Sequence, residues 1–146
     1  MKISAKGDYA CRALLELALN YENNRPVQLS EIVQNQGIPD QYLVQILAVL
    51  KGAGFVKSKR GADGGYLLTR PPATMTLGDV VRAVEGPLLT LKCSNEDDSP
   101  PCPRIPICEF HPIWEEVRET IANMLNNITF EQICRRSSRF NHMYHI

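Results

Sequence analysis

The sequence lacks the features of several common protein classes. No apolar run approaches the ~18 residues that span a bilayer, and the first residues are too polar and too short to form a secretion signal. We find no phosphate-binding glycine loop, no Ser-His-Asp pattern and no indication of a catalytic carboxylate pair. We therefore expect neither a membrane protein nor an enzyme. We expect a cytoplasmic protein, whose thiols stay reduced.

The chain also lacks an excess of charge of either sign. Its 146 residues carry 16 basic and 16 acidic side chains, and this zero net charge argues against a general polyanion binder. The charges are unevenly placed, because residues 1–72 hold nine Lys/Arg against six Asp/Glu, and residues 73–146 hold seven against ten. A local basic patch on a neutral protein favours selective contact with nucleic acid, although a solvated charged face has the same composition.

Helical periodicity dominates the first third of the chain. Ser4 is suited to cap a helix whose apolar stripe covers residues 9–21. Ser30 should cap a second, short helix, which Gly37 ends in a left-handed conformation, and another apolar stripe covers residues 42–50. Two short helices joined by a tight glycine turn predict a helix-turn-helix.

A β-hairpin is predicted directly after these helices. Residues 55–59 alternate at period two, a turn of sequence Arg-Gly-Ala-Asp-Gly-Gly follows, and residues 66–69 return. A helix-turn-helix followed by such a hairpin predicts a winged helix. We expect Arg60 to enter the minor groove of DNA. The turn is richer in glycine than a hairpin requires, so we expect close backbone approach to the ligand at Gly61, Gly64 and Gly65.

Further DNA contacts are predicted from the helix before the hairpin and from the hairpin itself. Three residues lie early enough on that helix to reach bases or phosphates: Gln41, Tyr42 and Gln45. Three lysines should contact phosphates: Lys51, Lys57 and Lys59. Helical spacing alone leaves Tyr42 equally compatible with a place in the core.

A proline-rich segment holds three of the five cysteines. Cys93, Cys102 and Cys108 are separated by eight and five residues, and His111 follows the last of them by three positions. The prolines exclude a regular helix or strand over most of the segment. Three thiols and an imidazole form a ligand set for zinc or for an iron–sulfur cluster, and the spacing does not separate the two. A disulfide is less favoured, because three thiols cannot pair completely.

The last third of the chain predicts a long amphipathic helix. Pro112 is suited to its first turn, and its apolar stripe runs from Ile113 to Ile128. So wide a stripe either packs under its own domain or pairs with a second copy, and we favour pairing. Thr129 should cap a short final helix.

These residues also carry a resemblance to a known family. The run from Tyr42 through Gly54-Phe55-Val56 and Arg60-Gly61 to Gly64-Gly65-Tyr66 resembles the signature of the Rrf2 family of bacterial transcription regulators. The likeness extends to Lys6-Gly7 near the start, to the three clustered cysteines and to residues 125–129. It is greatest to the IscR members, and NsrR members are also similar.

The resemblance implies a homodimer that binds a palindromic promoter site in double-stranded DNA. It implies Cys93, Cys102 and Cys108 as ligands of an iron–sulfur cluster. It offers two fourth ligands: His111 with a [2Fe–2S] cluster, or Asp8 of the partner subunit with a [4Fe–4S] cluster. We favour the [2Fe–2S] form. Val44 stands where IscR has Glu, so the resemblance also predicts a different DNA target.

Together these observations predict a mainly α protein with a small β-hairpin wing. We expect a winged helix-turn-helix domain in residues 1–86, a cysteine-bearing cluster loop in residues 87–112, and a dimerisation helix with a C-terminal helix in residues 113–146. The predicted function is iron–sulfur-dependent transcription regulation that senses redox, iron or cluster status. The alternative is a clusterless thiol- or zinc-dependent regulator of the same fold.

Overall fold

The computed structural model describes residues 2–91, 93, 100–137 and 139. Most of the predicted cysteine spacer, residues 94–99, and the chain end, residues 140–146, lie outside this part. The described elements, in chain order, are α1 (Ala5–Leu19), α2 (Leu29–Gln36), α3 (Asp40–Gly52), β1 (Val56–Lys59), β2 (Gly65–Leu68), η1 (Pro72–Thr74), α4 (Leu77–Glu85), η3 (Ile105–Ile107), α5 (His111–Asn126) and α6 (Phe130–Arg136). The predicted mainly α fold with a hairpin wing is confirmed.

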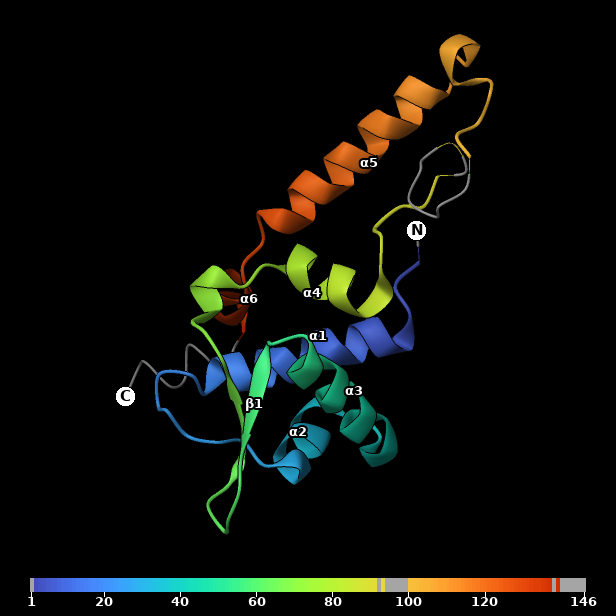
Figure 1. Cartoon of the computed structure of the whole chain (residues 1–146). Helices are drawn as coiled ribbons and strands as arrows, with labels where there is room; N and C mark the ends of the chain where they lie inside the picture. The colour runs from blue at the N-terminus through green and yellow to red at the C-terminus, as the bar shows by residue number, and fades with distance from the viewer. Residues whose placement is uncertain (1, 92, 94–99, 138, 140–146) are drawn as a thin grey trace.

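α1 is the central helix of the molecule (Figure 1). It is apolar on several sides, and α2, α3, α4, α6 and β2 all pack against it. Its buried residues include Ala10, Ala13, Leu14 and Leu17. The small alanines let neighbouring helices approach, and the leucines fill the space between them. The hydrophobic core therefore forms around the first helix of the chain.

The start of α2 differs from the prediction that Ser30 caps it. Val27 is held extended because it pairs with Tyr66 of β2, with its N–H 3.0 Å from the Tyr66 carbonyl. The helix begins as soon as this pairing ends, so its N-cap is Gln28, whose N–H donates to the Glu31 carboxylate at 3.0 Å. The Ser30 prediction was wrong by two positions because a contact with a distant strand sets the boundary.

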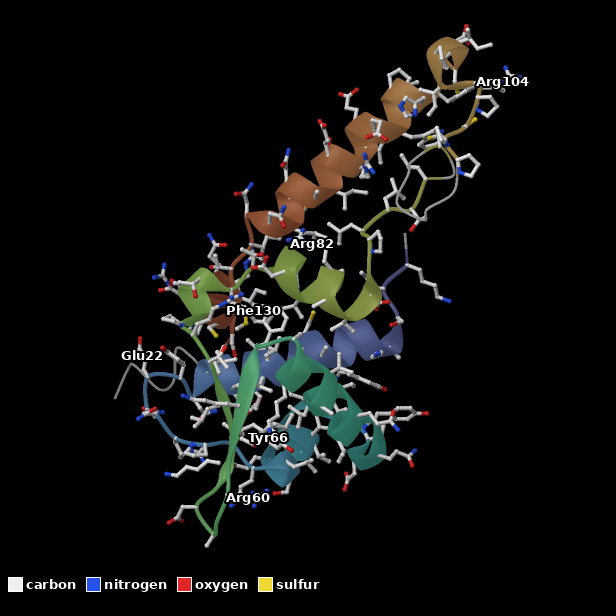
Figure 2. All side chains as sticks on the ribbon, in the orientation of Figure 1. Glu22, Arg60, Tyr66, Arg82, Arg104 and Phe130 are labelled. Atoms are coloured by element: carbon white, nitrogen blue, oxygen red, sulfur yellow. The ribbon has the colours of Figure 1, made fainter. Side chains whose placement is uncertain are left out.

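The last described helix, α6, packs against the first helix of the chain. α5 runs away from the other helices, and α6 lies back beside α1 (Figure 1). Thr129 caps α6 as predicted, and Thr76 caps α4 in the same way. The two threonines also pair with each other as an isolated bridge. Phe130 is 1% exposed and lies where α6 meets α1 (Figure 2). The last helix thus completes the core that the first helix begins.

α5 starts with Pro112 in its first turn, as predicted, and has no buried residue in the single chain. Its apolar stripe remains open: Ile113 is 51% exposed, Trp114 47% and Met124 67%. α5 packs on α4, and much of its apolar stripe stays exposed in the single chain, as is typical of surfaces that bind a partner. None of the described helices has the length and apolar character needed to cross a membrane.

Candidate functional site

α3 has one face in the core and one face in solvent. Leu43, Ile46, Leu47 and Leu50 are buried, whereas the opposite side exposes four residues: Gln41, Tyr42, Val44 and Gln45. Tyr42 is 51% exposed, so it is not a core aromatic. Its ring lies 6.4 Å from that of Tyr9 on α1. An exposed helix face of this kind, following a tight turn, has the shape that enters a major groove.

The turn before α3 is fixed by α1. Gly37 ends α2 with φ +64°, a left-handed conformation that glycine adopts without strain. The guanidinium of Arg12 donates to the carbonyl of Gln36, the residue before this glycine. Arg12 also pairs with Asp8 at 3.1 Å and lies over the ring of Tyr9 at 4.9 Å. The position of the exposed helix therefore depends on side chains of the first helix.

The wing carries the predicted cations in solvent. β1 and β2 pair antiparallel, and Lys57, Lys59 and Arg60 are exposed along one strand and its turn. Arg60 lies at the tip region of the hairpin (Figure 2). Lys51, at the end of α3, donates from its ammonium group to the hydroxyl of Ser58 at 2.7 Å. This bond links the end of α3 to the wing, so the charge of Lys51 is held close to the cations of the wing.

The glycines of the wing have reasons within the chain itself. A Cβ on Gly64 would lie 2.2 Å from the carbonyl oxygen of Lys59, and one on Gly65 would lie 2.5 Å from that of Val27. Both positions therefore require glycine for internal packing. Gly61 has φ +112° and open space around it. Each of the three glycines therefore has a structural reason, and the approach of DNA to Gly61, Gly64 and Gly65 stays a prediction.

The three clustered cysteines and His111 line a single cavity of about 500 Å³. The other walls are mostly apolar, and they come from both ends of the loop and from α5: Leu89, Thr90, Leu91, Phe110, Trp114 and Val117. Each of the three thiols is partly exposed. The sequence predicted the donors, but it gave no signal for the walls, because these residues come from separate elements.

His111 is already beside one thiol. Its Nδ1 lies 3.1 Å from Sγ of Cys93, although the two residues are 18 positions apart in the sequence. Within the described residues, no three His, Cys, Asp or Glu side chains converge closely enough to hold a single metal ion. A tetrahedral zinc centre, with Zn–S bonds of ~2.3 Å, needs its donors within ~4 Å of one another. The cavity of about 500 Å³ has room for an inorganic group larger than a single ion.

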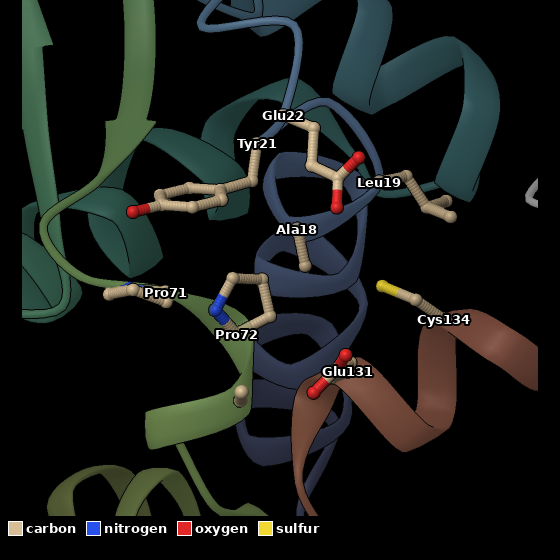
Figure 3. A pocket seen from close by; sticks show the side chains of 9 residues that line it. Ala18, Leu19, Tyr21, Glu22, Pro71, Pro72, Glu131 and Cys134 are labelled. Carbon is tan, nitrogen blue, oxygen red and sulfur yellow. The ribbon is translucent and has the colours of Figure 1, made fainter.

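The other two cysteines have a different environment. Burial, with the charges of Asp8 and Glu85 adding to it, raises the pKa of Cys11 to about 11. Burial likewise raises the pKa of Cys134 to about 11. Cys134 faces a small cavity of about 140 Å³ between α1, η1 and α6 (Figure 3). Both thiols are therefore harder to deprotonate than an exposed cysteine, and Cys134, at 2% exposed, packs in the core.

Residues 3–136 match the Rrf2 family, described as "Iron-dependent Transcriptional regulator". The transcriptional regulator IscR of Vibrio campbellii is 36% identical over 135 residues, which are 92% of this chain and 78% of that protein.

Two solved structures share the fold at similar identity. CymR, the global cysteine regulator of B. subtilis, superposes with a TM-score of 0.77 at 33% identity, covering 94% of this chain and 99% of CymR. IscR of T. potens gives a TM-score of 0.74 at 34% identity, covering 99% of this chain and 97% of that one. The relatives are named as regulators and not as enzymes, and the chain belongs to the Rrf2 family of transcriptional regulators.

Proposed function

We propose that this DNA-binding regulator carries an iron–sulfur cluster in the cavity between the cysteine loop and α5. The observation that carries the proposal is the convergence of Cys93, Cys102, Cys108 and His111 on one mostly apolar cavity. Thiolates are the usual ligands of such clusters, and imidazole replaces thiolate in some of them. When bound, the cluster supplies one-electron chemistry and sensitivity to oxidants, so that the protein can respond to redox, iron or cluster status.

His111 is our proposed fourth ligand, with a [2Fe–2S] cluster. Its ring nitrogen already lies 3.1 Å from Sγ of Cys93. The alternative, Asp8 of the partner subunit with a [4Fe–4S] cluster, would have to leave an ion pair. In this chain the Asp8 carboxylate is 3.1 Å from Nε of Arg12. One imidazole among three thiolates makes a cluster easier to protonate and to lose, which suits a sensor.

The DNA contacts follow from the exposed face of α3 and from the wing. Gln41, Tyr42 and Gln45 would contact bases and phosphates, and Val44 offers methyl contact to thymine. Lys51, Lys57 and Lys59 would neutralise phosphates, and Arg60 would enter the adjacent minor groove. Gly61, Gly64 and Gly65 would allow close approach of the wing to DNA, and Gly64 and Gly65 would also shape the wing.

The uncovered stripe of α5 supports a homodimer. Two copies joined through α5 would place two α3 helices about one DNA turn, ~34 Å, apart and so select a palindromic site. The cluster ligands end at the first residue of α5, His111. Cluster binding would therefore order the segment between the DNA-reading body and the dimer helix. Such a regulator acts in the cytoplasm, where the reducing thiol pool keeps the ligands free.

A clusterless thiol regulator of the same fold is the second candidate. The structural likeness to CymR, with a TM-score of 0.77, supports this candidate as much as the likeness to IscR, with a TM-score of 0.74, supports the cluster. The three cysteines and the imidazole around one cavity favour the cluster, because a thiol sensor needs no such set of donors. A mononuclear zinc site held by the same donors is the other clusterless form of this candidate.

A DNA-binding experiment tests the proposed switch. Cluster-loaded protein, prepared without oxygen, and a Cys102→Ala variant are compared on genomic fragments by gel shift at several salt concentrations. We expect the two proteins to differ in affinity on at least one promoter, because coupling requires different affinities in the two states. Equal affinity of both proteins on every fragment would remove the cluster from the control of DNA binding.

A further inference from the structure

Glu16 is a charged side chain inside the core that neither the DNA face nor the cluster cavity uses. It is 2% exposed. Both of its carboxylate oxygens accept hydrogen bonds from Arg139, at 3.0 Å from Nη1 and 2.6 Å from Nη2. The side-chain amides of Asn35 and Gln36 donate to the same carboxylate at 2.8 and 2.9 Å. A buried carboxylate with four donors is fully satisfied.

This network meets the helix-turn-helix at its turn. Asn35 and Gln36 are the last two residues of α2, and Gly37 follows them with its left-handed backbone. Gln36 is held twice, because its carbonyl also accepts a hydrogen bond from Arg12, one turn before Glu16 on α1. Two side chains of α1 thus fix the point from which the chain turns into α3.

We propose that Arg139 is a positioning residue for the DNA-reading helix α3. It supplies the positive charge that allows Glu16 to remain ionised in the core and to hold the end of α2. Without Arg139, the buried carboxylate must take up a proton or move toward water, and either change weakens its bonds to Asn35 and Gln36. The angle of α3 would then be less well defined. This inference rests on the proposed DNA binding.

The link joins distant parts of the sequence. Arg139 lies 123 residues after Glu16, in the segment that follows α6. α6 itself follows α5, whose apolar stripe we assign to the dimer. The chain beyond the dimer helix is therefore in direct contact with the element that sets the reading helix. Displacement of this segment would change the angle of α3 without changing the residues of α3 that face DNA.

The experiment compares DNA affinity among matched variants of the full chain. A duplex is first selected from a random pool with the cluster-loaded wild type. Affinity for this duplex and for a scrambled one is then measured well below the unfolding temperature of each protein. We expect Arg139→Gln to lower the ratio of the two affinities about tenfold, within the usual range of coupling between sites. Arg139→Lys, which keeps the charge, should retain most of the ratio.

Two further variants separate positioning from loss of charge. Arg135→Gln removes a cation one turn earlier, from an exposed pair with Glu131 at 2.9 Å, and should leave the ratio unchanged. The double variant Glu16→Gln/Arg139→Gln leaves no buried charge, so it should recover most of the ratio. Hydrogen exchange at the amides of residues 36–38 should become faster in Arg139→Gln alone.

The possible outcomes distinguish this inference from the proposed function. A ratio for Arg139→Gln equal to that of the wild type, or equal to that of Arg135→Gln, would overturn the positioning role. Failure of the double variant to recover the ratio would overturn it as well. If the wild type selects no duplex, the proposed function fails. Hydrogen exchange then still tests the link, because unchanged exchange at residues 36–38 would refute it.

Discussion

Replacing Met124 by Gln tests whether the open stripe of α5 is the dimer interface. Met124 is 67% exposed in the single chain and lies apart from the residues that line the cluster cavity. Gln has a similar length and helix propensity but a polar end. The change therefore removes apolar surface from the proposed interface with little effect on the helix or on the cluster ligands.

The size of the effect follows from the exposed surface. Full burial of a Met side chain contributes ~1.5–3 kcal/mol, so covering the remaining two-thirds contributes ~1–2 kcal/mol in each copy. A twofold interface contains the residue twice, which gives ~2–4 kcal/mol for the dimer. At ~1.4 kcal/mol per tenfold change, the dimer Kd should rise by ~30- to 700-fold.

Sedimentation equilibrium over a range of protein concentrations measures this Kd. Glu119→Gln is the matched control, since Glu119 is an exposed residue of α5 outside the apolar stripe, and it should dimerise as the wild type does. The visible absorbance per chain should be the same in all three proteins. A Met124→Gln dimer as tight as the wild type would show that the two copies meet through another surface.

Two other predictions concern acid stability and DNA affinity. Burial by itself would raise the pKa of Glu16, but hydrogen bonds from Arg139, Gln36 and Asn35 outweigh it, so the folded-state pKa lies below the ordinary 4.5. The stabilisation from Glu16 is thus complete above pH 4.5 and is lost as the pH falls toward the folded-state pKa. The free energy of unfolding should therefore fall more steeply with decreasing pH in the wild type than in Glu16→Gln, and parallel curves for the two proteins would contradict this. Lys57→Gln should weaken binding to all DNA sequences alike and reduce the slope of log affinity against log salt by about 1; an unchanged slope would exclude Lys57 from phosphate contact.

Local signals in the sequence were sufficient for most of the fold. Helix periodicity, the caps at Ser4, Thr76 and Thr129, and the alternation before the wing all act within a few residues, so the sequence displays them directly. The boundary of α2 could not be predicted in this way. It depends on the pairing of Val27 with Tyr66, which are far apart in the chain.

The candidate site was predictable in its donors and less so in its surroundings. Three thiols and one imidazole stand out in any sequence, but their convergence on one cavity depends on how the loop meets α5. Glu16 has no signal at all, because a single Glu on a helix resembles an exposed residue. Its burial and its pairing with Arg139 arise only when the last segment packs against the first helix. The glycines of the wing were recognised, yet two of them serve packing inside the chain.

The central claim is that the cavity beside α5 holds an iron–sulfur cluster, and the direct measurement is an iron and sulfide count with an absorption spectrum on protein purified without oxygen. We predict a coloured protein with charge-transfer bands and about two iron and two sulfide ions per chain, the content of a [2Fe–2S] cluster. The bands should shift in His111→Ala and disappear in Cys102→Ala. Colourless, iron-free protein, even after reconstitution with iron and sulfide, would contradict the account and favour the clusterless thiol regulator.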